Sequence, residues 1–339
     1  MTGLSNELLL QALKPLAAYY NRANIEEVAI NRPEEIWLKY SGKGWEAEQA
    51  PEITYRYVVA LCRVLANVTE QDFDKDKIPI LAATLPGGHR FQAVIGPNVR
   101  YDISDTFGMA ICVRCFKKDK RFSLADYNLN PGEGLMQLPE EQQRRRKYAD
   151  TPYEDLIGAV EHGEAVLISG ATATGKTTFL NALVEFIPEN RRVITVEDTR
   201  EVLLPQTNRV HLVVSRTASA NQVGYGHILD SVVRLTPDVI ICGEISIGNV
   251  KSIYRLMTTG HSNFLATIHA DSPQMAIKAF WQNLTQHDMN LDPKAVVEII
   301  AMSFGRIVQI DRSSGQRIVT GVEVPTLIAE SLADELRGR

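Results

Sequence analysis

The chain has 339 residues, of which 45% are hydrophobic and 23% are charged, and its formal net charge is -5. This length favours two domains, and the composition is that of an ordinary globular protein. The acidic balance argues against a protein whose main task is to coat nucleic acid, although a local basic face stays compatible with it. No apolar run approaches the roughly 18 residues that a membrane-spanning helix needs, so we expect no transmembrane segment.

The first 125 residues show the mixed pattern of a small α+β domain. An amphipathic helix opens the chain, with Leu8, Leu9, Ala12, Leu13 and Leu16 on one side. Further on, turns that contain glycine separate short apolar and aromatic runs, which is typical of β-hairpins. In chain order we expect strands at 26–31, at 35–40 and from 45 onward, a helix at 54–67, and strands at 80–85, 90–95 and 109–116.

Four cysteines are present. Cys112 and Cys115 have the spacing of metal ligands, but no second pair lies nearby, and a tetrahedral zinc site needs four ligands. We therefore interpret them as thiols of an apolar strand. Such thiols are typical of a reducing compartment, so we expect a cytoplasmic protein.

Residues 126–150 combine loop-forming residues with a highly charged run, and we interpret them as a linker. Residues 144–147 within it could contact acidic lipid or nucleic acid, but a solvated linker helix is the simpler interpretation. From residue 151 to residue 339, strand and helix patterns alternate. This alternation predicts an α/β domain with a parallel sheet.

Residues 170–177, GATATGKT, fit the phosphate-binding loop G-x-x-x-x-G-K-[ST] without a mismatch. In such a loop backbone N–H groups surround the phosphates, Lys176 reaches the β- and γ-phosphates, and the Thr177 hydroxyl binds Mg²⁺. A strand at 165–169 and a helix at 178–185 would place the phosphate at a helix N-terminus. The predicted binding residues are Gly170, Ala171, Thr172, Ala173, Thr174, Gly175, Lys176, Thr177 and Thr178.

Reactive side chains follow three further predicted strands. The strand at 192–196 is followed by Glu197, the one at 239–242 by Gly243 and Glu244, and the one at 263–268 by His269. In open parallel sheets ligands bind beyond the carboxyl ends of the strands. We therefore expect these side chains to gather around the nucleotide.

The two carboxylates compete for one role. We expect Glu197 to act on the attacking water and Glu244 to belong to the Mg²⁺ shell, and the reverse assignment stays open. His269 can donate to a γ-phosphate or to a catalytic carboxylate, and His261 is a second candidate. Asp238 precedes its strand at the amino end, so we interpret it as a turn residue rather than a metal ligand.

These motifs, in this order, resemble the secretion ATPase superfamily, which covers ATPases of type IV secretion and conjugation, type II secretion and type IV pili. The marks of the family are a Walker A loop, an acidic Asp box, an atypical Walker B motif that ends in Gly-Glu, and a His box. The corresponding segments here are 170–177, 194–202, 234–244 and 259–272. The N-terminal segments 27–33 and 88–94 resemble, more weakly, the small domain of the type IV branch.

The resemblance implies a RecA-like P-loop NTPase motor domain (151–339) preceded by a small α+β domain (1–125). It further implies ATP hydrolysis with Mg²⁺, a homohexamer, and inner-membrane secretion-machinery proteins as partners. It places the protein in the cytoplasm, in peripheral contact with the inner membrane, and no specific nucleic acid is expected. The length favours the type IV secretion branch over the alternative, a type IV pilus or type II secretion motor.

The resemblance also implies that an arginine of the N-terminal domain reaches the nucleotide. Arg114 is the first candidate, and Arg90 and Arg121 are alternatives. One departure concerns the position two residues after Glu244, where many relatives carry arginine and this chain carries Ser246. A nucleotide-binding scaffold with negligible turnover, or a RecA-like motor on DNA, are the alternatives from other classes.

Overall fold

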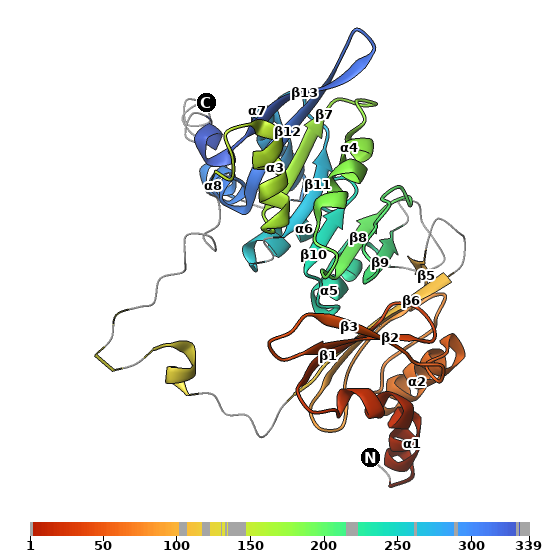
Figure 1. Ribbon diagram of the computed structural model, residues 1–339. Helices are drawn as coiled ribbons and strands as arrows, with labels where there is room; N and C mark the ends of the chain where they lie inside the picture. Colours follow the sequence, from red (N-terminus) through yellow and green to blue (C-terminus); the bar gives the residue numbers. More distant parts are fainter. Residues whose placement is uncertain are drawn as a thin grey trace.

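The structure is a computed structural model that describes residues 3–101, 107–116, 123–129, 131–132, 134, 147–214, 223–260, 263–287, 291–329 and 332. Figure 1 shows two parts, which we call the N-terminal part (within residues 3–116) and the C-terminal part (within residues 147–329). The predicted linker at 126–150 falls mostly outside the described residues, and so do Arg121, His261 and residues 144–146. The domain boundaries therefore stay a prediction.

The N-terminal part is an antiparallel sheet with two helices on one face (Figure 1). Its strands lie in the spatial order β4-β5-β6-β1-β2-β3. Thr54 starts the second helix by accepting a hydrogen bond from the backbone N–H of Tyr57 at 3.1 Å, a cap worth about 1 kcal/mol. The elements are α1 (Gly3–Tyr20), β1 (Ile25–Ile30), β2 (Glu35–Tyr40), β3 (Trp45–Gln49), α2 (Tyr55–Val68), β4 (Ile80–Thr84), β5 (Arg90–Arg100) and β6 (Phe107–Arg114).

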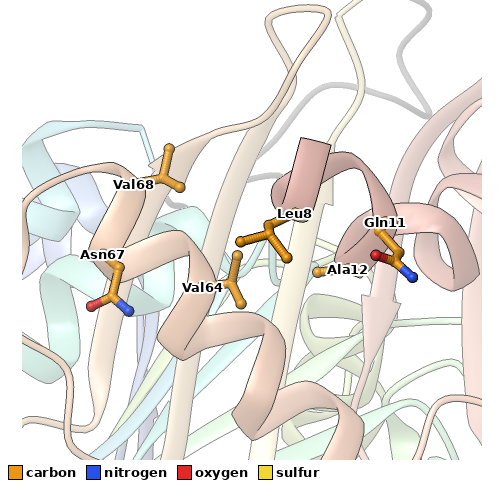
Figure 2. Close-up of a pocket in the computed structure, with 6 residues that line it drawn as sticks. All are labelled: Leu8, Gln11, Ala12, Val64, Asn67 and Val68. Atoms are coloured by element: carbon orange, nitrogen blue, oxygen red, sulfur yellow. The ribbon is translucent and has the colours of Figure 1, made fainter. Parts of the chain in front are cut away.

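The predicted apolar side of α1 is buried only in part. Leu9, Leu13 and Leu16 are buried as expected, but Leu8 is 57% exposed. The core-facing stripe of the helix is narrow, and Leu8 lies at its edge, where it faces Val64 of α2 across a groove of about 430 Å³ (Figure 2). The expected helix is present, and the apolar side predicted for it is only partly buried.

The C-terminal part is an α/β sheet in the order β13-β12-β7-β11-β10-β8-β9, parallel except for the antiparallel β13. The helices are α3 (Pro152–Glu161), α4 (Lys176–Leu183), α5 (Tyr225–Arg234), α6 (Val250–Thr258), α7 (Pro273–Thr285) and α8 (Pro293–Ser303). The strands are β7 (Ala165–Gly170), β8 (Val193–Glu197), β9 (Arg209–Val213), β10 (Val239–Cys242), β11 (Phe264–Ile268), β12 (Phe304–Ser313) and β13 (Gln316–Glu323).

Both faces of this sheet are covered, so its strands are apolar throughout rather than alternating. Along β7, Val166 and Ile168 pack with Leu180 of α4 on one face. Leu167 points to the other face and belongs to the cluster that includes α5, α6, α7 and α8. Two helical layers therefore hold the sheet rigid beneath its carboxyl edge.

The two parts share their β-structure. In the described chain one 13-stranded sheet runs through both, because the end of β5 pairs with β9, with Val99 opposite Leu212 and Arg100 opposite His211. Gly96 makes the bend in β5: its φ is +89°, and a Cβ there would lie 1.9 Å from the carbonyl oxygen of Lys75. We expected this strand to end at residue 95, but it continues to Arg100.

A buried arginine, Arg192, lies at the interface between the two parts. Arg192 precedes β8 and is fully buried, with Nη1 2.6 Å from Oδ1 of Asn31 and 2.8 Å from Oδ1 of Asn208. Its guanidinium lies 5.5 Å from the ring centre of Trp45. These contacts offset part of the cost of burying the charge, but Nη2 has no hydrogen-bond partner among the described residues, and burial lowers the pKa of Arg192. Asn31 and Trp45 come from the N-terminal part, which therefore packs against the amino ends of the parallel strands.

No helix in the described ranges has the length and apolar character needed to cross a membrane. Cys112 lies buried within β6, and Cys115 follows that strand, both as free thiols.

Candidate active site

The phosphate loop connects β7 to α4. Gly170 ends the strand, and Gly175, with a φ of +94°, precedes the first helical residue, Lys176. The ammonium of Lys176 donates to the carbonyl oxygens of Gly170 at 2.9 Å and of Ala171 at 3.0 Å. Burial lowers the pKa of Lys176, and the charge of Glu244 opposes this shift. The lysine is thus held inside the loop, where its charge is weakly solvated.

His269 connects the loop to the neighbouring carboxylate. Its Nδ1 lies 3.0 Å from Nζ of Lys176, and its Nε2 lies 3.6 Å from Oε2 of Glu244. A protonated lysine is a donor only, so Nδ1 of His269 accepts, and a neutral ring then carries its proton on Nε2, toward Glu244. The ends of β7, β11 and β10 are therefore joined by a chain of three polar side chains.

Glu197 lies at the same carboxyl edge of the sheet, at the end of β8, but its carboxylate is more enclosed than that of Glu244. Its Oε1 accepts from the Thr195 hydroxyl at 2.7 Å and from Nη1 of Arg200 at 2.8 Å. Its Oε2 accepts from the backbone N–H groups of Glu201 and Val202, both at 2.8 Å. The residue is only 2% exposed. Four donors hold this carboxylate in place.

A cavity of about 300 Å³ lies between α4 and these strand ends. Gly243 lies beside Glu197 in the wall of this cavity: a Cβ there would be 3.5 Å from Cγ of Glu197, an ordinary van der Waals contact. Thr177 and Glu244 both border this space, and a hydroxyl and a carboxylate are oxygen ligands of the type that Mg²⁺ prefers. Its lining residues are Thr177, Glu197, Asp198, Thr199, Glu201, Val202, Gly243 and Glu244.

Arg114 lies away from this cavity in the same chain. Its Nη2 is 2.9 Å from Oε1 of Glu27, and Lys39 connects Glu27 to Asp238 through contacts of 3.7 and 3.8 Å. Asp238 stands at the amino end of β10, the opposite end from Glu244. Arg90 is the strand partner of Arg114 and lies beside it.

Asp238 itself contacts the N-terminal part. Its Oδ2 accepts from the indole of Trp45 at 3.2 Å and from the backbone N–H of Arg192 at 2.8 Å. The structure thus brings together Lys176, Glu244, His269 and Glu197, and it places neither Asp238 nor Arg114 with them.

Sequence reasoning missed several side chains at the site. Arg200 lies three residues after Glu197, a spacing visible in the sequence, yet its ion pair depends on a bend that only the fold shows. Arg317 of the β12–β13 hairpin lies against the phosphate loop: a Cβ on Gly175 would be 2.8 Å from its Nε. No local pattern connects two residues so far apart in the chain.

The architecture is that of a P-loop NTPase motor domain preceded by a small α+β domain, as predicted. The family described as "Type II/IV secretion system protein" matches residues 11–317. The chain belongs to this family.

Curated relatives cover most of the chain. The type IV secretion system protein VirB11 of Bartonella quintana is 31% identical over 298 residues, 82% of either chain. The type IV secretion system protein PtlH of Bordetella pertussis is 30% identical over 321 residues, 91% of this chain and 90% of that one. These relatives confirm the predicted type IV secretion branch over the alternative of a pilus or type II secretion motor. Membership of this family of secretion ATPases implies ATP hydrolysis.

A solved structure supports the fold. The VirB11 ATPase from the Brucella suis type IV secretion system, crystallised with sulphate, superimposes with a TM-score of 0.81 at 24% identity. The match covers 97% of this chain and 98% of that one. The predicted fold class is confirmed.

Proposed function

We propose that the protein hydrolyses ATP with Mg²⁺ in the cavity between the phosphate loop and the ends of β8, β10 and β11, and that this hydrolysis energises a type IV secretion system. The observation that carries the proposal is the series of side-chain contacts from Lys176 through His269 to Glu244 at the mouth of the loop. It joins a cation for the transferred phosphate to a carboxylate for the attacking water.

The loop residues from Gly170 to Thr178 would hold the phosphates. Backbone N–H groups at the start of α4 point toward this space, and the helix N-terminus favours negative charge. The Thr177 hydroxyl borders the cavity beside Glu244 and is the residue that would hold Mg²⁺. A bound Mg²⁺ supplies charge neutralisation for the phosphoryl oxygens.

We assign the attacking water to Glu244 and not to Glu197, the reverse of the division expected from the sequence. Both oxygens of Glu197 accept two hydrogen bonds each, and the residue is almost inaccessible. The side chain of Glu244 is 34% exposed and faces Nε2 of His269. A general base must reach the proton that it accepts, which the geometry of Glu244 allows. Glu197 instead organises the wall of the cavity.

Arg317 adds positive charge on the outer side of the loop. A Cβ on Gly175 would lie 2.8 Å from Nε of Arg317, so the arginine side chain lies against the backbone of the phosphate loop. We include it among the nucleotide-binding residues, since arginine pairs well with phosphate.

Assembly and placement in the cell follow from the family resemblance. We propose a homohexamer that contacts inner-membrane machinery proteins and associates peripherally with the membrane from the cytoplasm. Arg114→Ala tests the role of the N-terminal arginine: the expected result is lost hydrolysis with an unchanged oligomer. Full activity with unchanged nucleotide affinity would show that the C-terminal part completes the site without Arg114.

The direct test of the function is phosphate release from Mg·ATP by the purified protein. Wild type should turn over, and nucleotide should bind to it with micromolar to millimolar affinity, which calorimetry can measure. Binding without turnover would favour the scaffold alternative. Turnover that requires single-stranded DNA would favour a DNA motor.

A further inference from the structure

The wall of the nucleotide site is connected to the N-terminal part through two buried side chains. We propose that Thr195 and His211 are positioning residues, which couple the attachment of β5 on β9 to the orientation of Glu197. This inference rests on the proposed function of the site, because it concerns how the same cavity is shaped.

The hydrogen bonds of His211, Thr195 and Glu197 form a series in which each residue donates to the next. Thr195 has a single hydroxyl proton, which it donates to Oε1 of Glu197 at 2.7 Å. Its Oγ1 also lies 3.0 Å from Nδ1 of His211, so that contact requires Nδ1–H to be the donor. Burial, together with the charges of Arg200 and Arg209, lowers the pKa of His211 to about 2, and the ring is therefore neutral with its one proton on Nδ1.

The pairing of β8 with β9 connects the same residues through the backbone. Thr195 is the strand partner of His211, and Glu197 is the partner of Val213. The backbone N–H of Val214 also donates to the carbonyl oxygen of Glu197 at 2.9 Å. A shift of β9 therefore moves both the hydroxyl that holds the carboxylate and the backbone that carries it.

On its other edge, β9 pairs with β5 of the N-terminal part. Arg100 of β5 is the strand partner of His211, and the side-chain amide of Asn98 donates to the carbonyl oxygen of Val213 at 2.9 Å. Figure 1 shows the end of β5 beside β9. β5 bends at Gly96, where its register shifts: residues 90–96 pair with strands of the N-terminal part, Val99 and Arg100 pair with β9, and Arg100 also pairs with Phe107 of β6. A change in the angle between the two parts must act on this bend.

The orientation of Glu197 matters because this carboxylate shapes the cavity. It fixes the backbone of Glu201 and Val202, and both residues line the space opposite Thr177. Without the Thr195 hydroxyl, one of its four donors is lost inside the protein, where an under-satisfied carboxylate is costly. The wall would then settle in a different position, and catalysis depends on such positions to about 1 Å.

The first experiment separates positioning from stability in the full-length protein. Thr195→Val keeps the shape and removes the donor, whereas Thr195→Ser keeps the donor. Ser231→Ala is the matched control, because it removes a buried hydroxyl that donates to His227 in α5. We expect Thr195→Val to lower kcat by about tenfold or more with KM for ATP within about threefold, and Thr195→Ser to restore kcat to within about threefold. A kcat for Thr195→Val equal to that of Ser231→Ala overturns the proposal.

A second pair of variants keeps the test decisive should Thr195→Val fold poorly. His211→Asn places an amide N–H near the position of Nδ1, and His211→Leu removes the donor. The proposal requires kcat to be higher in His211→Asn than in His211→Leu. Equal kcat values in these two variants, both folded by thermal unfolding, contradict it.

The coupling itself is read by hydrogen exchange with Mg·ADP as the probe. In wild type we expect the nucleotide to slow exchange of the amides at 98–100 and 211–213, and in Thr195→Val we expect this effect to disappear at saturating nucleotide. An identical effect in both proteins, or no effect in a wild type that binds Mg·ADP, overturns the coupling. A wild type that neither binds nor hydrolyses ATP removes the proposed function itself, which the phosphate-release assay shows separately.

Discussion

The ammonium of Lys176 lies 3.0 Å from Nδ1 of His269, so the phosphate loop and the end of β11 are in direct contact. The two residues are 93 positions apart in the chain, and only the order of the parallel strands brings them together. This contact explains why the lysine, although buried, stays directed at the mouth of the loop.

Lys176→Ala is expected to abolish turnover. Loss of one charge-stabilising contact at the transferred phosphate costs roughly 3 kcal/mol or more in the transition state, about a hundredfold in kcat. The fold should change little, because the lysine contacts the loop carbonyls rather than the hydrophobic core. Lys294→Ala on α8, which removes an exposed ion pair with Glu298, is the control. Near-normal phosphate release by Lys176→Ala would refute the site.

The two carboxylates should respond differently to replacement by glutamine. Glu244→Gln should bind Mg·ATP with little change and hydrolyse it at least about a hundredfold more slowly, with an unchanged melting temperature. Glu197→Gln should lower the melting temperature, because its amide N–H₂ would face donors where the carboxylate accepted them. Isothermal titration, phosphate release and thermal unfolding of both variants distinguish the roles. A stable Glu197→Gln protein that binds ATP but does not hydrolyse it would show that Glu197, and not Glu244, acts on the attacking water.

Arg317→Ala should weaken nucleotide binding more than it slows chemistry. The guanidinium lies on the loop at Gly175, and one charge-assisted contact with phosphate is worth about 1.5–3 kcal/mol, roughly ten- to a hundredfold in Kd. Arg312→Ala, at the strand partner of Arg317, provides the comparison. An unchanged Kd for Mg·ATP in Arg317→Ala would remove this residue from the site.

Acid should destabilise the protein through His211. Its pKa is lowered from 6.5 to about 2, so between these values the unfolded chain binds a proton that the folded chain does not. Stability is therefore fully present above pH 6.5 and falls as the pH drops toward 2, by up to about 1.4 kcal/mol per pH unit from this one residue. In His211→Asn, urea unfolding at pH 4–7 should show a shallower dependence. The same slope in wild type and variant would mean that other groups account for the acid sensitivity.

The sequence predicted the elements whose patterns are local. Residues 35–40 form the expected strand, and Thr54 caps the expected helix. The continuation of β5 past Gly96 was missed, because Gly-Pro normally ends a strand and its partner β9 lies more than a hundred residues away. The strand ends of the site followed from one rule about parallel sheets, and the structure places them around one cavity.

The chemical roles could not be predicted in the same way. Whether a carboxylate is a base or a structural acceptor depends on the donors around it, and those of Glu197 come from a bend after its strand and from the strand itself. The contacts of Arg114 depend on how the two parts pack, and the hydrophobic periodicity of the sequence does not predict this packing. Arg317 reaches the loop only because the β12–β13 hairpin extends past β7.

The pairing of β5 with β9 has a consequence for solubility. A strand at the border of a sheet exposes unpaired N–H and C=O groups, which recruit strands from other molecules. Here the N-terminal part shields part of that border of β9 and also supplies Asn31 to the buried guanidinium of Arg192. A C-terminal fragment produced alone would uncover both at once. The N-terminal part therefore also protects the edge of β9 from pairing with strands of other molecules.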